Sequence, residues 1–234
     1  MANYSTEGII INIRNFLEAD RIIKILSKDK GIFEAIAKGA RKPTTRKSSS
    51  IEILNSGKML FAKGKNLHLL LEVKLEDDYQ GKINPLDINY YFYFAELLNK
   101  TLVEVDTGMY QKIKTLRDSL PQKIKLTLLK LQLLLLHNLG VIPNLRNCIE
   151  CSDSLKEERY VISNQIGYFC KIHAGESQKI TDREIKIQLF LLENGDGKNE
   201  QLDVEHEFNT LFDLHNTWIE STIERKINSF KLLS

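Results

Sequence analysis

Residues 8–37 read GIIINIRNFLEADRIIKILSKDKGIFEAIA, and this stretch decides the fold. It contains three apolar runs rich in β-branched residues, at positions 8–13, 21–27 and 32–37. Asp29-Lys30-Gly31 separates the last two runs. β-branched side chains favour strands, whereas Asp and Gly favour turns. The stretch therefore predicts three consecutive strands joined by short connections.

The same pattern continues beyond this stretch. Further apolar runs lie at 51–54, 58–62 and 67–73, and Lys63-Gly64-Lys65 supplies a turn signal between the last two. Short strands that precede helices predict an α+β chain led by a small antiparallel barrel. We expect five strands, which is the size of an OB-fold. Periodicity alone leaves an SH3-like barrel or an open sheet as alternatives.

Helical spacing replaces strand spacing from about Asp87 onward. Helices are predicted over residues 86–105, 108–119, 122–139 and 202–230. Asp87 is a candidate N-cap, and Thr181-Asp182-Arg183-Glu184 has the pattern of a helix start. The leucine-rich run 126–139 is too short and too often interrupted to span a membrane, so it predicts a buried helix. We expect an OB-fold nucleic-acid-binding domain at 1–80 and a helical domain at 81–234.

Charge is divided unevenly along the chain. Residues 1–75 contain 14 Lys and Arg against 7 Asp and Glu, whereas the remaining residues contain 19 against 24. Such asymmetry suggests that the first part meets a polyanion. Composition alone does not show whether that polyanion is DNA, RNA or a surface of lipid headgroups.

A basic loop is predicted between the third strand and the next apolar run. No acidic residue lies between Glu34 and Glu52, and this window carries five cations: Lys38, Arg41, Lys42, Arg46 and Lys47. Such a loop suits a phosphate backbone, although a solvated connector is the alternative reading. Few aromatic residues accompany it, so we expect electrostatic, sequence-tolerant binding. Five contacts to a single strand would give a slope of log K against log salt of roughly −3.5.

The only cysteines of the chain form a metal-ligand pattern. Cys148-Ile149-Glu150-Cys151 is followed, after eighteen residues, by Cys170-Lys171-Ile172-His173. Four ligands from two short pairs predict a closed, structural zinc site within a zinc-finger-like segment at 147–175. Buried cysteines, a Cys148–Cys151 disulfide and a Cys170/His173 nucleophile pair are the alternatives. No secretory leader is seen, so we expect a cytoplasmic chain in which disulfides are rare.

Two other functional classes stay open on the residues alone. One is an RNA-binding OB-fold protein with a structural zinc site. The other is a zinc-dependent hydrolase, which needs an open metal position and a carboxylate base. The chain has no P-loop, no G-x-G-x-x-G and no G-x-S-x-G motif. We therefore predict a protein that is not an enzyme and has no catalytic residues.

Three segments resemble the bacterial recombination mediator family RecO. They are Thr6-Glu7-Gly8-Ile9-Ile10, Glu18-Ala19-Asp20-Arg21-Ile22 and the stretch from Gly31 to Ala37-Lys38-Gly39-Ala40-Arg41-Lys42-Pro43. Weaker similarity continues through Leu139-Gly140-Val141-Ile142-Pro143 to the zinc segment. Members usually place four cysteines in that segment, and here His173 takes the fourth position.

The resemblance implies an N-terminal OB-fold, a helical C-terminal domain and a zinc-finger-like insertion. It implies binding of single- and double-stranded DNA, annealing of complementary strands and work in the bacterial cytoplasm at the nucleoid. It also implies partnership with RecR and single-strand-binding protein, and indirectly with RecA, which is loaded onto the coated strand. The matching motif implies that Lys38, Arg41 and Lys42 contact DNA, and less directly that Arg21 does so. Glu18 and Asp20 are expected to orient that neighbouring arginine.

Overall fold

The computed structural model describes residues 2–42, 49–65, 67–76, 79–141, 143–155, 159–162, 165–175, 177–193 and 202–233. Its contacts form two compact units. The barrel unit comprises Met1–Gln122 with Ile227–Ser234, and the Cys/His unit comprises Lys123–Lys226. The predicted division at residue 80 follows a different criterion, the change from strands to helices, and it stays a prediction.

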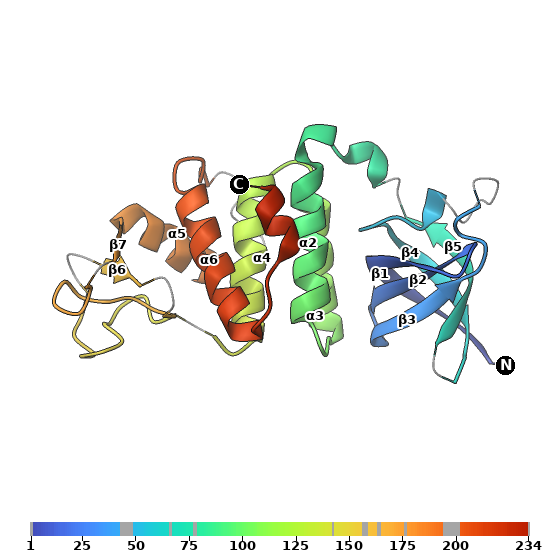
Figure 1. The fold of residues 1–234 in the computed structure, drawn as a ribbon, viewed down its shortest axis with the longest axis horizontal. Helices are drawn as coiled ribbons and strands as arrows, with labels where there is room; N and C mark the ends of the chain where they lie inside the picture. The colour runs from blue at the N-terminus through green and yellow to red at the C-terminus, as the bar shows by residue number, and fades with distance from the viewer. Residues whose placement is uncertain are drawn as a thin grey trace. The chain divides into compact units, whose positions relative to one another are not determined.

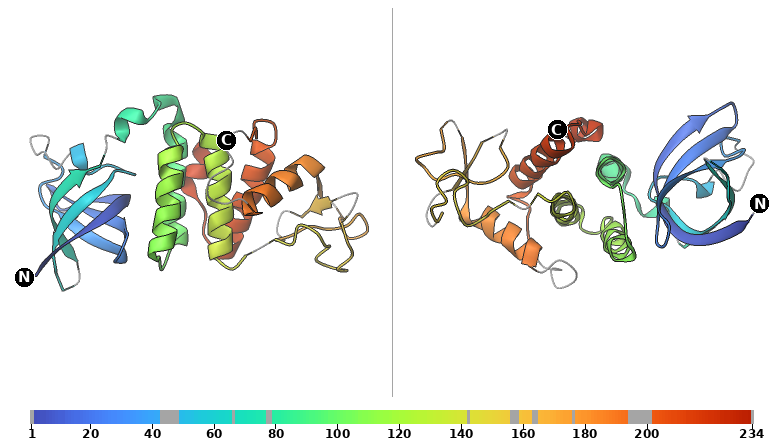
Figure 2. Two further views of the ribbon diagram at one scale, coloured as in Figure 1. Left: turned by 180° about the vertical axis from the view of Figure 1, so that it is seen from behind. Right: turned by 90° about the horizontal axis from the view of Figure 1, so that it is seen from below.

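Five strands close into a barrel within the barrel unit (Figures 1 and 2). They are β1 (Asn3–Phe16), β2 (Asp20–Ser27), β3 (Gly31–Ala37), β4 (Ser56–Ala62) and β5 (His68–Leu75). Their order round the barrel is β1-β2-β3-β5-β4. β1 is 14 residues long, which lets it pair with β2 over 8–16 and with β4 over 3–9. β3 and β5 pair in parallel. The predicted five-stranded barrel at the head of an α+β chain is confirmed.

Residues 51–54, which we expected to be extended, belong to no strand, and residues 53–54 form a turn. Leu54 has a φ of 64°, in the left-handed region that extended backbone does not use. Its N–H donates to Ile10 O at 2.8 Å, and Ile10 N–H donates to Asn55 O at 2.9 Å. Ile51 and Leu54 are fully buried. Their apolar character therefore reflects burial under the barrel rather than membership of a strand.

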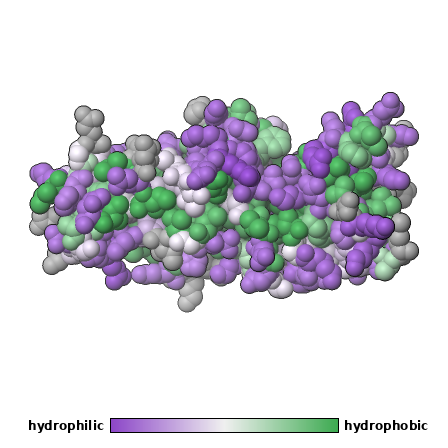
Figure 3. All heavy atoms as spheres, turned by 60° about the horizontal axis from the view of Figure 1, so that its bottom comes forward, coloured by the Kyte–Doolittle hydropathy of each residue, from purple (hydrophilic) through white to green (hydrophobic). Residues whose placement is uncertain are grey.

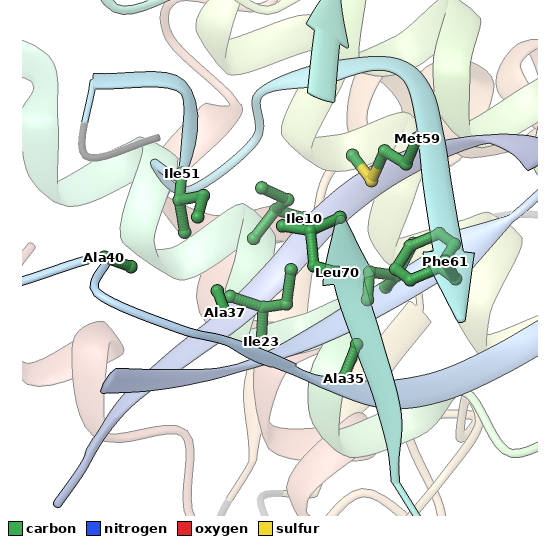
Figure 4. Packing of buried hydrophobic residues seen from close by; sticks show 10 residues of the cluster. Ile10, Ile23, Ala35, Ala37, Ala40, Ile51, Met59, Phe61 and Leu70 are labelled. Carbon is green, nitrogen blue, oxygen red and sulfur yellow. The ribbon is translucent and has the colours of Figure 1, made fainter. Parts of the chain in front are cut away.

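Side chains from all five strands fill the barrel interior (Figure 4). Residues two apart share a face of a strand, so pairs such as Ile23 and Ile25 in β2 or Met59 and Phe61 in β4 both point inward. Two residues of the connection between β3 and β4, Ala40 and Ile51, join this core from outside the strands. The connection is thus anchored to the barrel at two points.

Helices and short 3-10 turns complete the barrel unit. They are η1 (Gln80–Lys82), η2 (Pro85–Asp87), α2 (Ile88–Thr101), α3 (Thr107–Ser119) and η3 (Asn228–Leu232). Asp87 occupies the N-cap position of α2, as predicted, but its side chain makes no cap hydrogen bond. Lys24 of β2 donates to the backbone and side-chain oxygens of Asn99 in α2, at 3.0 and 2.9 Å. Arg117 Nε of α3 donates to Leu54 O at 2.8 Å. These contacts tie both helices to the barrel.

The C-terminal η3 is held against α2 by one carboxylate. Glu96 accepts hydrogen bonds from the backbone N–H groups of Asn228 and Ser229, at 3.0 and 2.7 Å, and from the Ser229 hydroxyl. Lys100, one turn along α2, pairs with the same carboxylate at 2.7 Å. These hydrogen bonds and the ion pair lower the pKa of Glu96, although burial opposes the effect.

The described residues of the Cys/His unit form three helices and a two-stranded sheet. The helices are α4 (Ile124–Asn138), α5 (Asp182–Glu193) and α6 (Phe208–Ile223), and the strands are β6 (Arg159–Val161) and β7 (Gln178–Ile180). α4 and α6 lie side by side, and Gln132 of α4 donates to Phe212 O of α6 at 3.0 Å (Figure 1). Most side chains of α4 are buried, which confirms the predicted buried helix.

The predicted start of α5 is confirmed by a capping box. Thr181 N–H donates to the Glu184 carboxylate at 2.6 Å, and Glu184 N–H donates to Thr181 Oγ1 at 3.2 Å. Among the described residues, no helix combines the length and hydrophobicity that crossing a membrane requires. On the face drawn in Figure 3, hydrophilic and hydrophobic residues are interspersed.

Candidate nucleic-acid interface and metal centre

Residues 38–42 form a turn after β3 that is fastened to the turn between β1 and β2. Gly39 N–H donates to Asp20 Oδ1 at 2.8 Å, and Arg41 N–H donates to Ala19 O at 3.0 Å. The Arg41 guanidinium donates to Leu17 O at 3.0 Å. Two of the three segments that carry the family resemblance, 18–22 and 31–43, meet here. Asp20 therefore positions this turn, whereas we expected it to orient the neighbouring Arg21.

The turn separates apolar anchors from exposed cations. Ala37 and Ala40 are fully buried in the barrel core, whereas Lys38, Arg41 and Lys42 are exposed. Gly39 between them has a φ of 69°, a conformation that glycine adopts without strain. We call Lys38, Arg41 and Lys42 the basic turn. The small buried residues hold the backbone of this turn in place. The cations between and after them present positive charge to solvent.

Arg21 is placed differently from the basic turn. Its guanidinium donates to Ile51 O at 3.1 Å and lies 3.5 Å from Glu52 Oε1, and its side chain is only 23% exposed. Arg21 therefore helps to hold the far end of the connection between β3 and β4. Arg46 and Lys47, the other two predicted contacts in this connection, lie outside the described residues.

The four predicted metal ligands come together in the Cys/His unit. The ligand atoms of Cys148, Cys151, Cys170 and His173 all lie within 4.8 Å of one another. Cys151 Sγ is 3.9 Å from Cys170 Sγ, and His173 Nδ1 is 3.8 Å from Cys148 Sγ and 3.2 Å from Cys170 Sγ. A tetrahedral ion with thiolate and imidazole ligands would separate its ligands by about 3.5–3.8 Å. The cluster therefore has dimensions that could hold a metal ion.

Tight turns present both ligand pairs. Ser152 N–H donates to Cys148 O at 2.9 Å, and Ser152 has a φ of 62° where the first turn ends. His173 N–H donates to Cys170 O at 3.1 Å in the second turn. Ile149 N–H donates to Tyr168 O at 3.0 Å, which links the two turns. The pairs are therefore held together by backbone hydrogen bonds as well as by their side chains.

The pKa values of the cluster show how its charges interact. Burial opposes ionisation of Cys148, but the backbone N–H groups of Cys151 and Cys170 help to lower its pKa to about 6. The N–H of His173 lowers the pKa of Cys170, and the Cys170 thiol in turn raises the pKa of His173. At Cys151 the N–H of Asp153 favours the thiolate, yet burial and the neighbouring thiols raise the pKa to about 11. A cation at the centre would favour all three thiolates.

The composition of the cluster indicates a structural metal site rather than a hydrolytic one. Its four members fill a tetrahedral shell, and no carboxylate of the described residues belongs to the group. A hydrolytic metal site keeps one position open for water and places a base beside it. The three cysteines are free rather than paired in a disulfide.

Sequence reasoning missed a buried polar network that joins this segment to two helices. The Tyr168 hydroxyl donates to Gln188 Oε1 of α5 at 2.9 Å, and His215 Nε2 of α6 lies 3.1 Å from the same oxygen. Trp218 Nε1 of α6 donates to Gln165 O at 3.0 Å. Tyr168, Gln188 and His215 are fully buried. The residues that make these contacts are 20 to 53 positions apart, so no local sequence pattern indicates them.

The fold and the two sites define a class: an OB-type barrel with a basic turn, followed by helices and by a segment between α4 and α5 that carries a Cys3His cluster. Two family descriptions match the chain. The one described as "Recombination protein O N terminal" matches residues 1–79, and the one described as "Recombination protein O C terminal" matches residues 87–231. The chain therefore belongs to the RecO family of DNA repair proteins.

Individual relatives are described as DNA repair proteins. A "DNA repair protein RecO" of Clostridium perfringens (strain 13 / Type A) is 28% identical over 244 residues, which cover 100% of this chain and 98% of the relative. That of Symbiobacterium thermophilum is 28% identical over 174 residues, 68% of this chain and 65% of the relative. That of a Roseiflexus species (strain RS-1) is 33% identical over 160 residues, 66% of this chain and 56% of the relative. The last two matches thus span less than two thirds of the relative's length.

Proposed function

We propose that the chain is a DNA-binding recombination mediator that anneals complementary strands. It would also help to load RecA onto single-stranded DNA coated by single-strand-binding protein. The observation that supports this most is the basic turn, fastened to the edge of an OB-type barrel in a RecO-family chain. The proposal contains no catalytic step and treats the chain as a binding protein rather than as an enzyme.

Annealing is opposed by repulsion between two phosphate backbones. Each cation that contacts a phosphate releases a counterion and reduces this repulsion. Lys38, Arg41 and Lys42 are exposed within one five-residue turn, so they can meet one backbone together. Phosphate contacts of this kind carry no sequence information, which suits a protein that must accept any complementary pair.

The fastening of the turn makes it a better phosphate ligand. Ordering a long side chain at an interface costs about 0.5–1.5 kcal/mol, and a mobile loop adds a further backbone cost. Here the hydrogen bonds of the Gly39 and Arg41 N–H groups and the buried Ala40 fix the backbone before DNA arrives. A further hydrogen bond, from the Arg41 guanidinium to Leu17 O, orients that side chain. In this proposal Arg21 also contacts the phosphate backbone. Arg46 and Lys47 are included only because they are positively charged.

In this proposal the helical domain binds the protein partners. Residues 81–234 would form the domain that docks RecR and single-strand-binding protein, and RecA would be served indirectly. The chain would work on single- and double-stranded DNA at the nucleoid, in the bacterial cytoplasm. The family membership supports these assignments.

Zinc is the metal proposed for the Cys3His cluster. Three thiolates and one imidazole in a closed tetrahedral set are ligands that zinc accepts. When bound, zinc cross-links the Cys148–Cys151 turn to the Cys170–His173 turn. The ion would stabilise the segment 147–175 and leave DNA contact to the barrel.

A strand-annealing assay tests the proposed function. Two complementary oligonucleotides, one carrying a fluorophore and the other a quencher, report the rate of duplex formation. The variant Lys38→Ala/Arg41→Ala/Lys42→Ala should anneal at least tenfold more slowly than the unchanged protein. The matched control Lys58→Ala/Lys82→Ala/Lys112→Ala removes the same charge from exposed positions of the barrel unit and should keep most of the activity.

Two outcomes would contradict the proposal. One is equal loss of annealing in both triple variants, which would show that only net charge matters. The other is tighter binding to RNA than to DNA of the same sequence, which would favour an RNA-binding role.

A further inference from the structure

Aromatic side chains close one end of the barrel. Tyr4 of β1, Phe33 of β3, Phe61 of β4 and His68 of β5 form this aromatic cluster, with ring centroids 5.0–6.3 Å apart in each pair that makes contact. Phe33 is near the start of β3, whereas the basic turn follows its last residue, Ala37. The two features therefore lie at opposite ends of that strand, roughly 13 Å apart along it.

The aromatic cluster extends from the hydrophobic core, against which Tyr4 and Phe33 pack, to the surface. Phe61 is fully buried and packs with the aliphatic core, as Figure 4 shows. Tyr4, Phe33 and His68 remain partly exposed. Tyr4 stacks on Phe61 with an interplanar angle of 25°, and its hydroxyl forms a hydrogen bond of 2.9 Å with His68 Nδ1. The Tyr4 ring is thus held in a fixed orientation at the surface.

Lysines lie round this end of the barrel. Lys30 Nζ lies over the Tyr4 ring, 6.0 Å from its centroid. Lys63 and Lys65 are exposed in the connection from β4 to β5, and Lys63 N–H donates to Ala2 O at 3.0 Å beside the start of β1. No acidic residue occurs between positions 61 and 71. Asp29 is nearby, but its carboxylate accepts hydrogen bonds from the hydroxyls of Thr6 and Ser27.

We infer that the aromatic cluster is a stacking subsite for nucleobases of single-stranded DNA. Rings that are fixed and partly exposed, with cations beside them, form the combination by which OB-type barrels bind single strands. Bases would stack on Tyr4 and Phe33 while Lys30, Lys63 and Lys65 meet the adjoining phosphates. The inference rests on the proposed function, to which it adds a second contact with the same strand.

Stacking can be separated from phosphate contact by removing the bases. Binding is measured for an oligothymidylate of about a dozen nucleotides, within the site size of an OB fold, and for an abasic strand of equal length and charge. The unchanged protein should prefer the strand with bases. Tyr4→Leu and Phe33→Leu keep an apolar side chain but remove a ring, so each should reduce that preference by about fivefold or more. Tyr4→Phe keeps the ring and should preserve it.

The basic turn distinguishes this inference from the proposed function. Lys38→Ala/Arg41→Ala/Lys42→Ala should weaken binding of both strands equally and leave the preference for bases intact. If the unchanged protein bound neither strand, both the proposed function and the inference would fail. An equal preference in the unchanged protein and in Tyr4→Leu would overturn the inference alone.

A second measurement uses the unchanged protein and does not depend on variant folding. Strands carrying 5-iododeoxyuridine are photocross-linked, and the modified peptides are identified by mass spectrometry. Adducts on Tyr4, Phe33 or His68 would support the inference. Adducts confined to other segments would overturn it. So would a Tyr4→Leu protein that binds DNA normally but loses a protein partner, because the cluster would then be a protein-docking surface.

Discussion

The carboxylate of Asp20 accepts a hydrogen bond of 2.8 Å from the backbone N–H of Gly39, nineteen residues further along the chain. This bond holds the basic turn from the side of β2. If the basic turn contacts DNA as proposed, this acidic residue would support the binding of a polyanion, because it holds the cations of the turn in position.

Replacing Asp20 by Ala therefore gives a prediction with an unexpected sign. Simple electrostatics predicts tighter DNA binding, because the variant loses a negative charge. We expect weaker binding, by severalfold, because the turn loses its anchor. Hydrogen bonds to charged groups contribute about 1.5–3 kcal/mol, so the free energy of unfolding should also fall. Titration of a fluorescent single strand, together with thermal unfolding, measures both effects.

Asp20→Asn is the matched control for this prediction. The amide oxygen can still accept the Gly39 N–H, and the negative charge is removed as in the Ala variant. The Asn variant should therefore bind DNA at least as tightly as the unchanged protein. Tighter binding by the Ala variant would show that the anchor has no role in DNA contact.

The salt dependence of binding gives a second prediction. Each cation that contacts a single strand contributes about 0.7 to the slope of log K against log salt. Removing Lys38, Arg41 and Lys42 together should make the slope shallower by about 2 if all three contact phosphates. Binding measured at four or more salt concentrations gives the slope. A variant with weaker binding but the original slope would place the phosphate contacts elsewhere.

The metal cluster gives a third prediction. Cys148→Ser should reduce the zinc content of the purified protein to well under one ion per chain and lower its thermal stability, because the buried ligand of the set is lost. Intrinsic DNA affinity should change little, since the basic turn belongs to the other compact unit. Metal analysis under reducing conditions without chelator measures the first effect, and thermal unfolding measures the second.

His173→Cys tests whether His173 is the fourth ligand of the metal. It replaces the imidazole by a fourth thiolate, which a tetrahedral zinc site accepts. Zinc content should be retained, in contrast with His173→Ala. Full zinc content in the Ala variant would exclude His173 from the ligand set.

Parts of this architecture can be predicted from the sequence because they leave local patterns. β-branched runs mark strands, and two short ligand pairs mark the metal cluster, since each pair sits on one tight turn. The run 51–54 shows the limit of such patterns. Ile51 and Leu54 are apolar because they are buried, and burial does not specify whether the backbone is extended. The pattern therefore predicts their environment but not their conformation.

Contacts between distant positions leave no such pattern. Asp20 is adjacent to Arg21 in sequence, which suggests an arginine partner, but its hydrogen bond goes to Gly39. Arg21 instead pairs with Glu52. Short-range spacing cannot decide between these arrangements, because both depend on how the turn after β3 folds back against the barrel.

His215 gives the last prediction, on stability and pH. Complete burial lowers the pKa of this imidazole to about 3, against about 6.5 in an unfolded chain. Between these two values the unfolded state binds a proton that the folded state does not bind. The contribution of His215 to the free energy of unfolding therefore falls as the pH falls from about 6.5 towards 3, by up to about 1.4 kcal/mol per pH unit.

His215→Leu should flatten this decline. Gln188 Oε1 would keep the Tyr168 hydroxyl as its donor in that variant. Denaturant unfolding at intervals between pH 7.5 and 4.5 gives the two curves, with His206→Leu as the control at an exposed histidine. Parallel curves for His215→Leu and the unchanged protein would show that His215 does not govern the loss of stability in acid.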